Sequence, residues 1–376
     1  MTQKKPPRKG KETLDYLQAL RGIAAMVVVL YHGSRFFLQT DGIAFGDYLF
    51  QSGGVMGVDL FFVISGFIMV YTTTNNNGSL EYSRGFFIKR FARVWPTYVI
   101  LTLIHSLFPP YGPGFFFTPG AFGLFAQTLT FVPTEFGTRD FAYPILSVGW
   151  TLNYEMYFYL IFGLSLLFGR GRWIVFFGWI WISMLWVGDS GYTIVYIAMI
   201  SDQIIWFFVA GVIIGLVYLS EFKISSILFC RIAVLLSGAF LLWQFYSGYQ
   251  VEHGLMLAGL SILPFVLVIS IASKTLVLTP PKWMLYLGDI SYSLYLVHTI
   301  VQKQSANLFK IIGLGDYANG FFFLVLTTAL SIGAAAISYR YLERGVAEYI
   351  RHYLNKATKT GLTRMQGPSN VARDQA

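Results

Sequence analysis

The sequence predicts an all-α integral membrane protein with about ten transmembrane helices and with both termini in the cytoplasm. Hydrophobic residues make up 55% of its 376 residues, and only 12% of the residues are charged. A soluble domain carries about 25% charged residues. The apolar residues are gathered in segments that reach or approach the roughly 20 residues needed to cross a bilayer. Composition and segment length together therefore exclude an ordinary soluble domain.

The apolar segments follow one another along the chain with polar or Gly- and Pro-containing breaks between them. The first is too long for the apolar part of a signal peptide and has no small-residue cleavage pattern, so we expect an uncleaved span. Pro96, near the start of the short third segment, suits the first turn of a helix. The expected spans are 14–37, 54–71, 94–108, 147–168, 173–187, 204–219, 227–246, 255–272, 290–308 and 321–341.

The segments between the spans are expected to be loops. Residues 39–53 form a polar loop without Lys or Arg, and residues 72–93 form a loop that carries four of these cations. The longest connection, 109–146, is aromatic and punctuated by Gly and Pro, and we expect it to be partly re-entrant around 121–131. Residues 188–203 are expected to form a further loop.

Loops rich in Lys and Arg alternate along the chain with loops that carry few of them, so the positive charges gather on one side of the membrane. Of the 27 Lys and Arg residues, 22 fall in the termini and in the loops of one side, which the positive-inside rule assigns to the cytoplasm. The opposite side holds only Arg35, Arg139, Lys303 and Lys310, while Arg21 lies within the bilayer. The net charge of +9 is therefore an orientation signal, and we expect membrane lipids but no nucleic acid as partners.

The chain is expected to divide into three parts. A basic cytoplasmic N-terminus at 1–13 precedes a ten-helix membrane domain at 14–343, and a basic, partly disordered cytoplasmic tail follows at 344–376. We find no internal repeat. Inverted repeats would have favoured a transporter. The single cysteine, Cys230, excludes an intrachain disulfide.

Arg21 and His32 are the unusual residues of the first span. Eleven positions separate them, which is about three helical turns, so both side chains point to nearly the same side, about 16 Å apart along the axis. Arginine is costly in hydrocarbon and is rarely left there without a partner. We therefore expect one long polar ligand to contact both residues.

Other ionisable residues are expected at matching depths. Asp59, Glu155 and His298 fall, with His32, in the outer half or the middle of the membrane. A histidine with carboxylates nearby can perform general acid–base chemistry near neutral pH. On the cytoplasmic side, Arg90 and Arg93 stand at i,i+3 on one helix face with Lys89 adjoining, a pattern suited to binding phosphates.

Each of these residues also has a purely structural interpretation. His32 could be a packing histidine, and Arg90 and Arg93 could be ordinary positive-inside flanks of a span. Asp59 could cap or position its helix, and the stripe that joins His298 to Tyr292 and Tyr295 could be plain helix packing. Intramembrane ionisable residues are, however, functional by default.

Five motifs follow one another along residues 15–343. They are Arg21-x10-His32, Gly57-Val-Asp-Leu-Phe-Phe-Val-Ile-Ser-Gly-Phe67, Arg90-x-x-Arg93, Val148-Gly-Trp-Thr-Leu-Asn-Tyr-Glu-Met-Tyr-Phe-Tyr159 and Ser291-Tyr-Ser-Leu-Tyr-Leu-Val-His298. In this order they resemble the signatures of the membrane-bound acyltransferase-3 family. The fourth motif is most similar to the subgroup that acetylates bacterial exopolysaccharides such as succinoglycan.

The resemblance implies an enzyme of the bacterial cytoplasmic membrane that moves an acetyl or other acyl group from cytoplasmic acyl-CoA to a sugar hydroxyl. Acetyl-CoA would be the co-substrate, a polysaccharide or lipid-linked oligosaccharide would be the acceptor, and no metal is expected. The family's histidine and paired arginine correspond to His32 and Arg21, and its arginine pair corresponds to Arg90 and Arg93.

We expect Arg90, Arg93 and Lys89 to bind the donor phosphates, while the pantetheine arm passes Arg21. His32 would be the general base, with Asp59 or Glu155 holding its imidazole, or else His32 would be acylated first. Ser65 lines the path and is an unsuitable nucleophile because no base is in sequence reach. Further residues expected along the substrate path are Trp150, Tyr159, Tyr295 and His298.

Two rival functions use the same residues. A transporter or flippase of a lipid-linked saccharide would bind substrate without chemistry. An acyltransferase could also act on another acceptor, such as an O-antigen sugar, peptidoglycan or a macrolide. Consumption of the thioester separates the first rival from an enzyme.

Overall fold

The computed structural model describes residues 14–34, 36, 44–133, 144–185, 195–346 and 348–349, and the side chains of 44–51 and 255 lie outside that description. The described residues form helices joined by turns, with no strand among them. The helices are α1 (Asp15–Ser34), α2 (Ala44–Thr72), α3 (Leu80–Ser106), α4 (Ala121–Thr130), α5 (Trp150–Ser165), α6 (Arg172–Leu185), α7 (Val195–Ile200), α8 (Ile205–Leu219), α9 (Ile227–Ser247), α10 (Tyr249–His253), α11 (Gly259–Ala272), α12 (Lys282–Asp289), α13 (Ser291–Ile311) and α14 (Gly320–Ser338), which a π-helix (Tyr339–Val346) continues.

The fold is that of a multi-pass membrane protein. Among the described residues, six helical stretches are long and apolar enough to cross a bilayer, and the shorter apolar stretch Met256–Ala272 adds to them. One of the six, Ser147–Leu185, reverses at Gly169, whose φ of 52° is left-handed, so it holds both α5 and α6. An all-helical membrane protein is confirmed, whereas the number of ten spans stays a prediction. The six stretches are Asp15–Ser34, Ser52–Thr72, Ser147–Leu185, Val195–Leu219, Ile227–Ser247 and Gly320–Val346.

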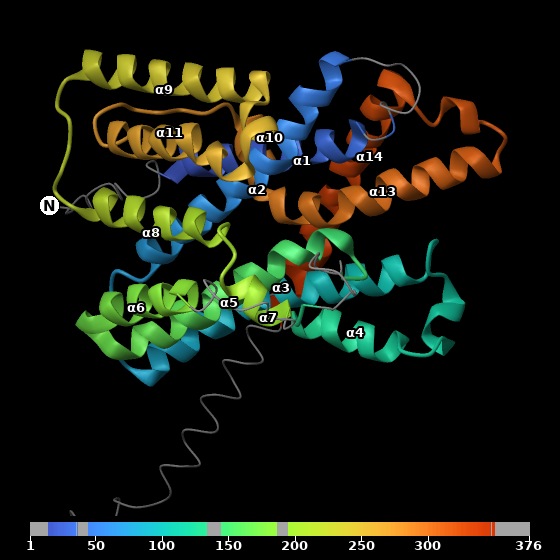
Figure 1. The fold of residues 1–376 in the computed structure, drawn as a ribbon, viewed down its shortest axis with the longest axis horizontal. Helices are drawn as coiled ribbons and strands as arrows, with labels where there is room; N and C mark the ends of the chain where they lie inside the picture. The colour runs from blue at the N-terminus through green and yellow to red at the C-terminus, as the bar shows by residue number, and fades with distance from the viewer. Residues whose placement is uncertain are drawn as a thin grey trace, which may run out of the picture.

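Helix α1 lies in the middle of the molecule (Figure 1). It packs against α2 on one side and against α12, α13 and α14 on the other. Helix α2 also packs extensively against α8, and α9 covers α11 at the outside of this group. Helices α3, α5 and α6 form the lower part of the same view. Helices α1 and α2 are thus packed against other helices on more than one side, so many of their side chains are buried between helices.

Helices α2 and α8 touch through their backbones. A Cβ added at Gly66 would overlap the carbonyl oxygen of Phe208, and one added at Gly211 would overlap the carbonyl oxygen of Val63. Small residues at such crossings let membrane helices approach closely, which replaces the hydrophobic driving force that is missing in lipid. Neither position therefore tolerates a side chain without a shift of one helix.

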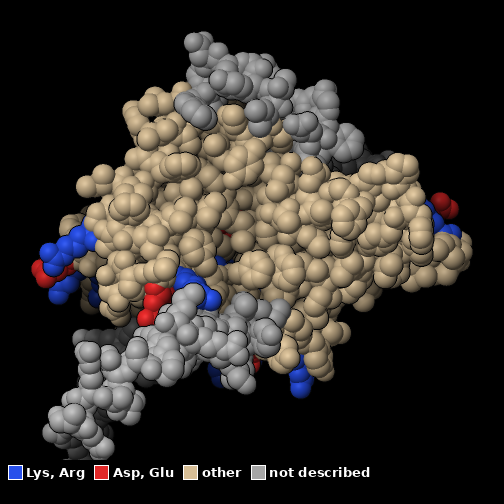
Figure 2. Space-filling model, turned by 90° about the horizontal axis from the view of Figure 1, so that it is seen from below, with Lys and Arg blue, Asp and Glu red and all other residues tan. Residues whose placement is uncertain are grey.

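Few charged side chains reach the surface in the wide middle band of the molecule (Figure 2). Figure 2 shows them mainly at the two ends of the long axis and along the lower rim, while the wide band between is mostly uncharged among the described atoms. Many large apolar side chains are exposed, including most of one face of α9. This pattern is typical of a surface that faces hydrocarbon.

Two expected loops are partly helical, and those expectations are wrong. Helix α2 begins at Ala44, inside the expected loop 39–53, and α3 begins at Leu80, inside the expected loop 72–93. Ser79 starts α3 as its N-cap, with its hydroxyl accepting a hydrogen bond from the Tyr82 amide at 3.1 Å. The cations expected in that loop therefore lie on a helix. For the same reason Pro96 lies inside α3 and not in its first turn.

The remaining differences concern short helices. The expected loop 109–146 contains α4, which lies in the stretch expected to be re-entrant; re-entrance itself stays a prediction. The expected loop 188–203 contains α7. Helix α12 was not expected; it packs against α1, where Gly288 approaches the Gln18 backbone. The expected N-terminus at 1–13, Arg35, Arg139 and most of the tail lie outside the described residues.

Candidate functional site

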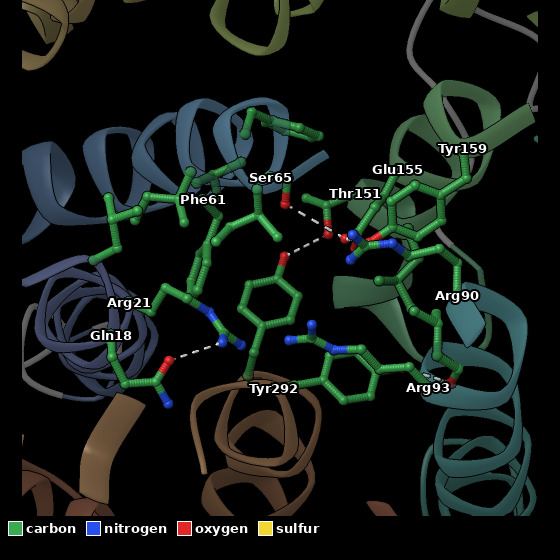
Figure 3. Close-up of a pocket in the computed structure, with 18 of the residues that line it drawn as sticks. Gln18, Arg21, Phe61, Ser65, Arg90, Arg93, Thr151, Glu155, Tyr159 and Tyr292 are labelled. Carbon is green, nitrogen blue, oxygen red and sulfur yellow. Dashed lines mark hydrogen bonds between the residues drawn. The ribbon is translucent and has the colours of Figure 1, made fainter. Parts of the chain in front are cut away.

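An inner cavity of about 200 Å³ lies between α1, α2, α3, α5 and α13. Figure 3 shows the guanidinium groups of Arg21, Arg90 and Arg93 pointing into it from α1 and α3, with Glu155 and Tyr159 from α5 beside them. The structure thus brings together residues that are more than 130 positions apart in the sequence. All three arginines that were expected to bind the donor line one space.

Arg21 is held by neighbours that fix its direction. Its Nη2 donates to the Ser291 hydroxyl at 3.0 Å, and its Nη1 donates to the Gln18 carboxamide oxygen at 3.3 Å. Gln18 in turn donates to Asp289 at 2.7 Å. These contacts use only part of the donor capacity of the guanidinium. The side chain is therefore oriented toward the cavity with donors to spare.

Arg90 and Arg93 also line a second space, a polar vestibule of about 570 Å³. Lys89 and Thr72 line the vestibule with them. Arg90 donates to the Thr72 hydroxyl at 3.1 Å, and its guanidinium lies 5.3 Å from the centre of the Tyr159 ring, within cation–π range. The arginine pair therefore stands where the vestibule meets the inner cavity.

Glu155 bonds to neighbours within the inner cavity. It accepts a short hydrogen bond from the Tyr159 hydroxyl, and the Ser65 hydroxyl lies 3.5 Å from the same carboxylate. At that distance the Ser65 contact is weak. Glu155 thus serves the inner cavity, while Asp59 lines the outer one described below.

Glu343 is a residue of this region that the sequence interpretation missed. It lies on the π-helix after α14 and accepts a hydrogen bond from the Ser293 hydroxyl at 2.9 Å. It is close enough to Arg21 and Arg93 to interact with both electrostatically. Its place at the end of the expected membrane domain, just after the last span and within a basic stretch, gave no sign of these interactions.

An outer cavity of about 830 Å³ lies on the far side of Tyr295. His32, Asp59 and Trp150 line it, together with Asp202 and Lys303. Asp59 is 3% exposed, and its Oδ2 has no hydrogen-bond partner among the described residues. Asp202, which the sequence interpretation did not single out, accepts a hydrogen bond from the Tyr154 hydroxyl at 2.7 Å. The outer cavity thus combines an aromatic wall with carboxylates and a cation.

Val58 and Tyr295 separate the two cavities, because both residues line both spaces. The Tyr295 hydroxyl lies 2.9 Å from the Thr151 hydroxyl and donates to the Val148 carbonyl at 3.2 Å. The ring also packs edge-on against Phe61, with 5.8 Å between centres. These contacts hold Tyr295 in place between the two cavities.

His32 and His298 form a direct pair. The Nε2 atom of His298 lies 3.1 Å from the Nδ1 atom of His32, and the rings are 4.9 Å apart between centres. His298 is fully buried and lines neither cavity. The expected substrate-path residues Ser65, Trp150, Tyr159 and Tyr295 do line one or both cavities, so His298 differs from them.

Fold and site together define a multi-pass membrane protein with a charged inner cavity next to an outer cavity that a histidine lines. The acyltransferase domain family matches residues 14–340. The chain therefore belongs to the acyltransferase-3 family of membrane O-acyltransferases, as its motifs predict. No cluster of three or more metal-binding His, Cys, Asp or Glu residues occurs in the part of the chain that the structure describes.

Three curated relatives are similar to this chain. The exopolysaccharide production protein ExoZ of Rhizobium meliloti (strain 1021) is 31% identical over 316 residues, which are 77% of this chain and 89% of the relative. Protein 2 in the picA locus of Rhizobium radiobacter is 32% identical over 99 residues, 26% of this chain and 47% of its own. The peptidoglycan O-acetyltransferase OatA of Listeria monocytogenes is 28% identical over 111 residues, 28% of this chain and 16% of its own. No solved structure matches.

Proposed function

We propose that this protein transfers an acetyl group from cytoplasmic acetyl-CoA, through its membrane domain, to a sugar hydroxyl of an exopolysaccharide or its lipid-linked precursor. One observation carries the proposal: the vestibule, the inner cavity and the outer cavity succeed one another and share lining residues, Arg90 and Arg93 at one junction and Val58 and Tyr295 at the other. A donor in the vestibule and an acceptor in the outer cavity can thus meet at Tyr295.

The donor is bound from the vestibule. Lys89, Arg90 and Arg93 face the phosphates of acetyl-CoA, because guanidinium groups bind phosphate oxygens in pairs. The slender pantetheine arm lies in the inner cavity past Arg21, and its size suits a space of about 200 Å³. The thioester then reaches the partition formed by Val58 and Tyr295.

His32 acts as the general base of the transfer. It takes the proton of the acceptor hydroxyl while that oxygen forms a bond to the thioester carbonyl carbon. The resulting tetrahedral intermediate collapses, the carbon–sulfur bond breaks, and the CoA thiolate leaves and receives the proton from His32. The products are the acetyl ester and CoA. An acyl-histidine intermediate at His32 is the alternative order of the same bond changes.

The acceptor occupies the outer cavity. Trp150 offers a ring for stacking on a sugar, and Asp59 and Asp202 offer carboxylate oxygens to sugar hydroxyl groups. The name of the rhizobial relative speaks of exopolysaccharide production, which supports a saccharide acceptor. The Listeria relative acts on peptidoglycan by name, so peptidoglycan is the acceptor to compare.

The membrane orientation follows from charge. We propose ten spans with both termini on the cytoplasmic side of a bacterial inner membrane, because 22 of the 27 Lys and Arg residues then fall on that side. The vestibule with its cations faces the cytoplasm in this orientation, and the outer cavity faces away from it. Helices α3 and α13 are proposed as two crossings in addition to the apolar stretches named above. Both carry charged or polar side chains of the path.

The first experiment measures thiol release from acetyl-CoA by the purified protein in nanodiscs, with and without a polysaccharide acceptor. Wild type should release thiol only with acceptor, and the His32→Ala variant should not. Release by both would retain the enzyme but remove His32 from the reaction. No release by either, with the fold intact and across donors and acceptors, would contradict the proposed activity.

A further inference from the structure

We propose that His298 is a positioning residue: it accepts the Nδ1 proton of His32 and so takes the part that a carboxylate plays in a Ser-His-Asp triad. This inference rests on the proposed role of His32 as general base. It starts from the 3.1 Å contact between His298 Nε2 and His32 Nδ1. A triad is recognised by the geometry and roles of its members and not by sequence position or residue type.

The direction of the hydrogen bond follows from the partners of the two rings. His298 Nδ1 lies 3.0 Å from the carbonyl oxygen of Leu294, which can only accept, so Nδ1 carries a hydrogen. In a neutral ring the lone pair is then on Nε2, the atom that faces His32. His32 Nδ1 also lies 3.0 Å from the carbonyl oxygen of Val28. These two neighbours of His32 Nδ1 are therefore both acceptors.

This pattern determines which nitrogen of His32 can act as a base. With the hydrogen on Nδ1, the lone pair of a neutral His32 is on Nε2. His32 lines the outer cavity, where the acceptor hydroxyl is expected. When Nε2 takes that proton, the imidazolium remains stabilised through Nδ1–H by a neutral acceptor, so no fixed negative charge has to be buried beside it. Asp59 is then left to bind the acceptor in the same cavity.

The helices hold the pair in register from both sides. Gln302, one turn beyond His298 on α13, donates to the Val29 carbonyl of α1 at 3.0 Å. At the other end of the same helix pair, Arg21 donates to the Ser291 hydroxyl at 3.0 Å. Hydrogen bonds above and below thus fix α1 against α13, and the positions 291, 298 and 302 lie on one face of α13. A histidine placed for packing alone would not need this alignment with a second ring.

Two variants of His298 separate positioning from packing. His298→Gln retains an oxygen that can accept from His32 Nδ1–H, whereas His298→Leu fills similar space without an acceptor. We expect His298→Leu to lower kcat by about 10²–10⁴-fold, the usual contribution of general acid–base catalysis, with little change in KM for acetyl-CoA. His298→Gln should recover most of the lost kcat. His105→Leu is the matched control, because His105 is 2% exposed and lines neither cavity.

A spectroscopic measurement tests the same inference without turnover. The chain has five histidines, so ¹⁵N-labelled histidine in lipid gives a spectrum that the His32→Ala and His298→Leu variants can assign. We expect both rings to carry hydrogen on Nδ1 and to be neutral at the pH of highest activity. Hydrogen on Nε2 of His298, or a charged His298, would make it the donor and overturn the inference.

The activity outcomes are equally decisive. A His298→Gln variant that is as impaired as His298→Leu, with thermal unfolding like wild type, would overturn a positioning role, as would a fully active His298→Leu variant. If wild type transfers no acetyl group to any acceptor, the proposed function fails instead. In that case the tautomers measured by ¹⁵N spectroscopy still decide whether His298 accepts from His32.

Discussion

The backbone contact between α2 and α8 allows a quantitative prediction. Alanine at Gly211 would place its Cβ on the carbonyl oxygen of Val63 and 2.8 Å from the carbonyl carbon. These are backbone atoms of a helix and cannot rotate away, so α8 must move from α2 by about 1 Å. Overpacking of this kind costs about 1–3 kcal/mol, against a gain of about 0.5–1 kcal/mol for replacing helical glycine by alanine. The difference of the two ranges is a net loss of up to about 2.5 kcal/mol.

The displacement would also reach the site. Helix α2 carries Val58 and Asp59 toward the outer cavity and Ser65 toward the inner one. A misplacement of about 1 Å can lower a rate by about 10²-fold even when the mutation is far from the chemistry. Gly211→Ala should therefore reduce acetyl transfer more than its loss of stability alone would suggest.

The assay compares thermal unfolding in nanodiscs with acceptor-dependent thiol release. Gly333→Ala is the matched control, because Gly333 lies inside α14 and an added Cβ would meet nothing within 4 Å. The control should unfold at or slightly above the wild-type temperature and retain activity. If Gly211→Ala unfolds and turns over like the control, α2 and α8 are not in close backbone contact at Gly211 and Val63.

Three further predictions concern the path. Arg93→Gln should raise KM for acetyl-CoA by about tenfold or more, because hydrogen bonds to charged groups contribute about 1.5–3 kcal/mol. Arg84 lies on the same helix and lines none of the three cavities, so Arg84→Gln should leave this KM unchanged. Tyr295→Ala should join the two cavities and increase acceptor-independent hydrolysis of acetyl-CoA, measured as thiol release without sugar; unchanged hydrolysis would argue against a partition there. Glu343→Gln removes a carboxylate that interacts with Arg21 and Arg93. The variant should therefore bind CoA with a lower dissociation constant in calorimetry, and its ligand-free form should unfold at a lower temperature. Weaker CoA binding would contradict this electrostatic account.

The sequence predicts the helical class and much of the site because both depend on local patterns. Apolar segment length identifies most of the helices. Arg21 and His32 were expected on one helix, and the structure has both on α1, where each lines a different cavity. The beginning of α3 is missed because charged residues in a row are typical of both a cytoplasmic loop and an extended helix end. Only the Ser79 N-cap distinguishes them.

What the sequence does not contain is the pairing between distant helices. His298 was grouped with the substrate path because its stripe on α13 was visible, but nothing local shows that this stripe faces His32 across 266 positions. The same holds for Glu343, whose contact with Arg93 depends on the π-helix after α14 turning back toward α3. Such contacts are fixed by the packing of several helices together, which no single segment encodes.

The distribution of charge along the path follows from what each compartment must hold. Three guanidinium groups around one small cavity face two carboxylates, Glu155 and Glu343, so the empty site carries excess positive charge in a poorly hydrated region. A polyanionic donor removes that excess, whereas a neutral sugar would not. In the outer cavity two carboxylates, Asp59 and Asp202, outnumber the one cation among its described lining residues, Lys303. The same cavity is lined by His32, whose described ring partners His298 and Val28 are neutral. In the proposed function, donor and acceptor are thus separated by the charge of their cavities as well as by the partition, and the proton would be transferred only where the two meet.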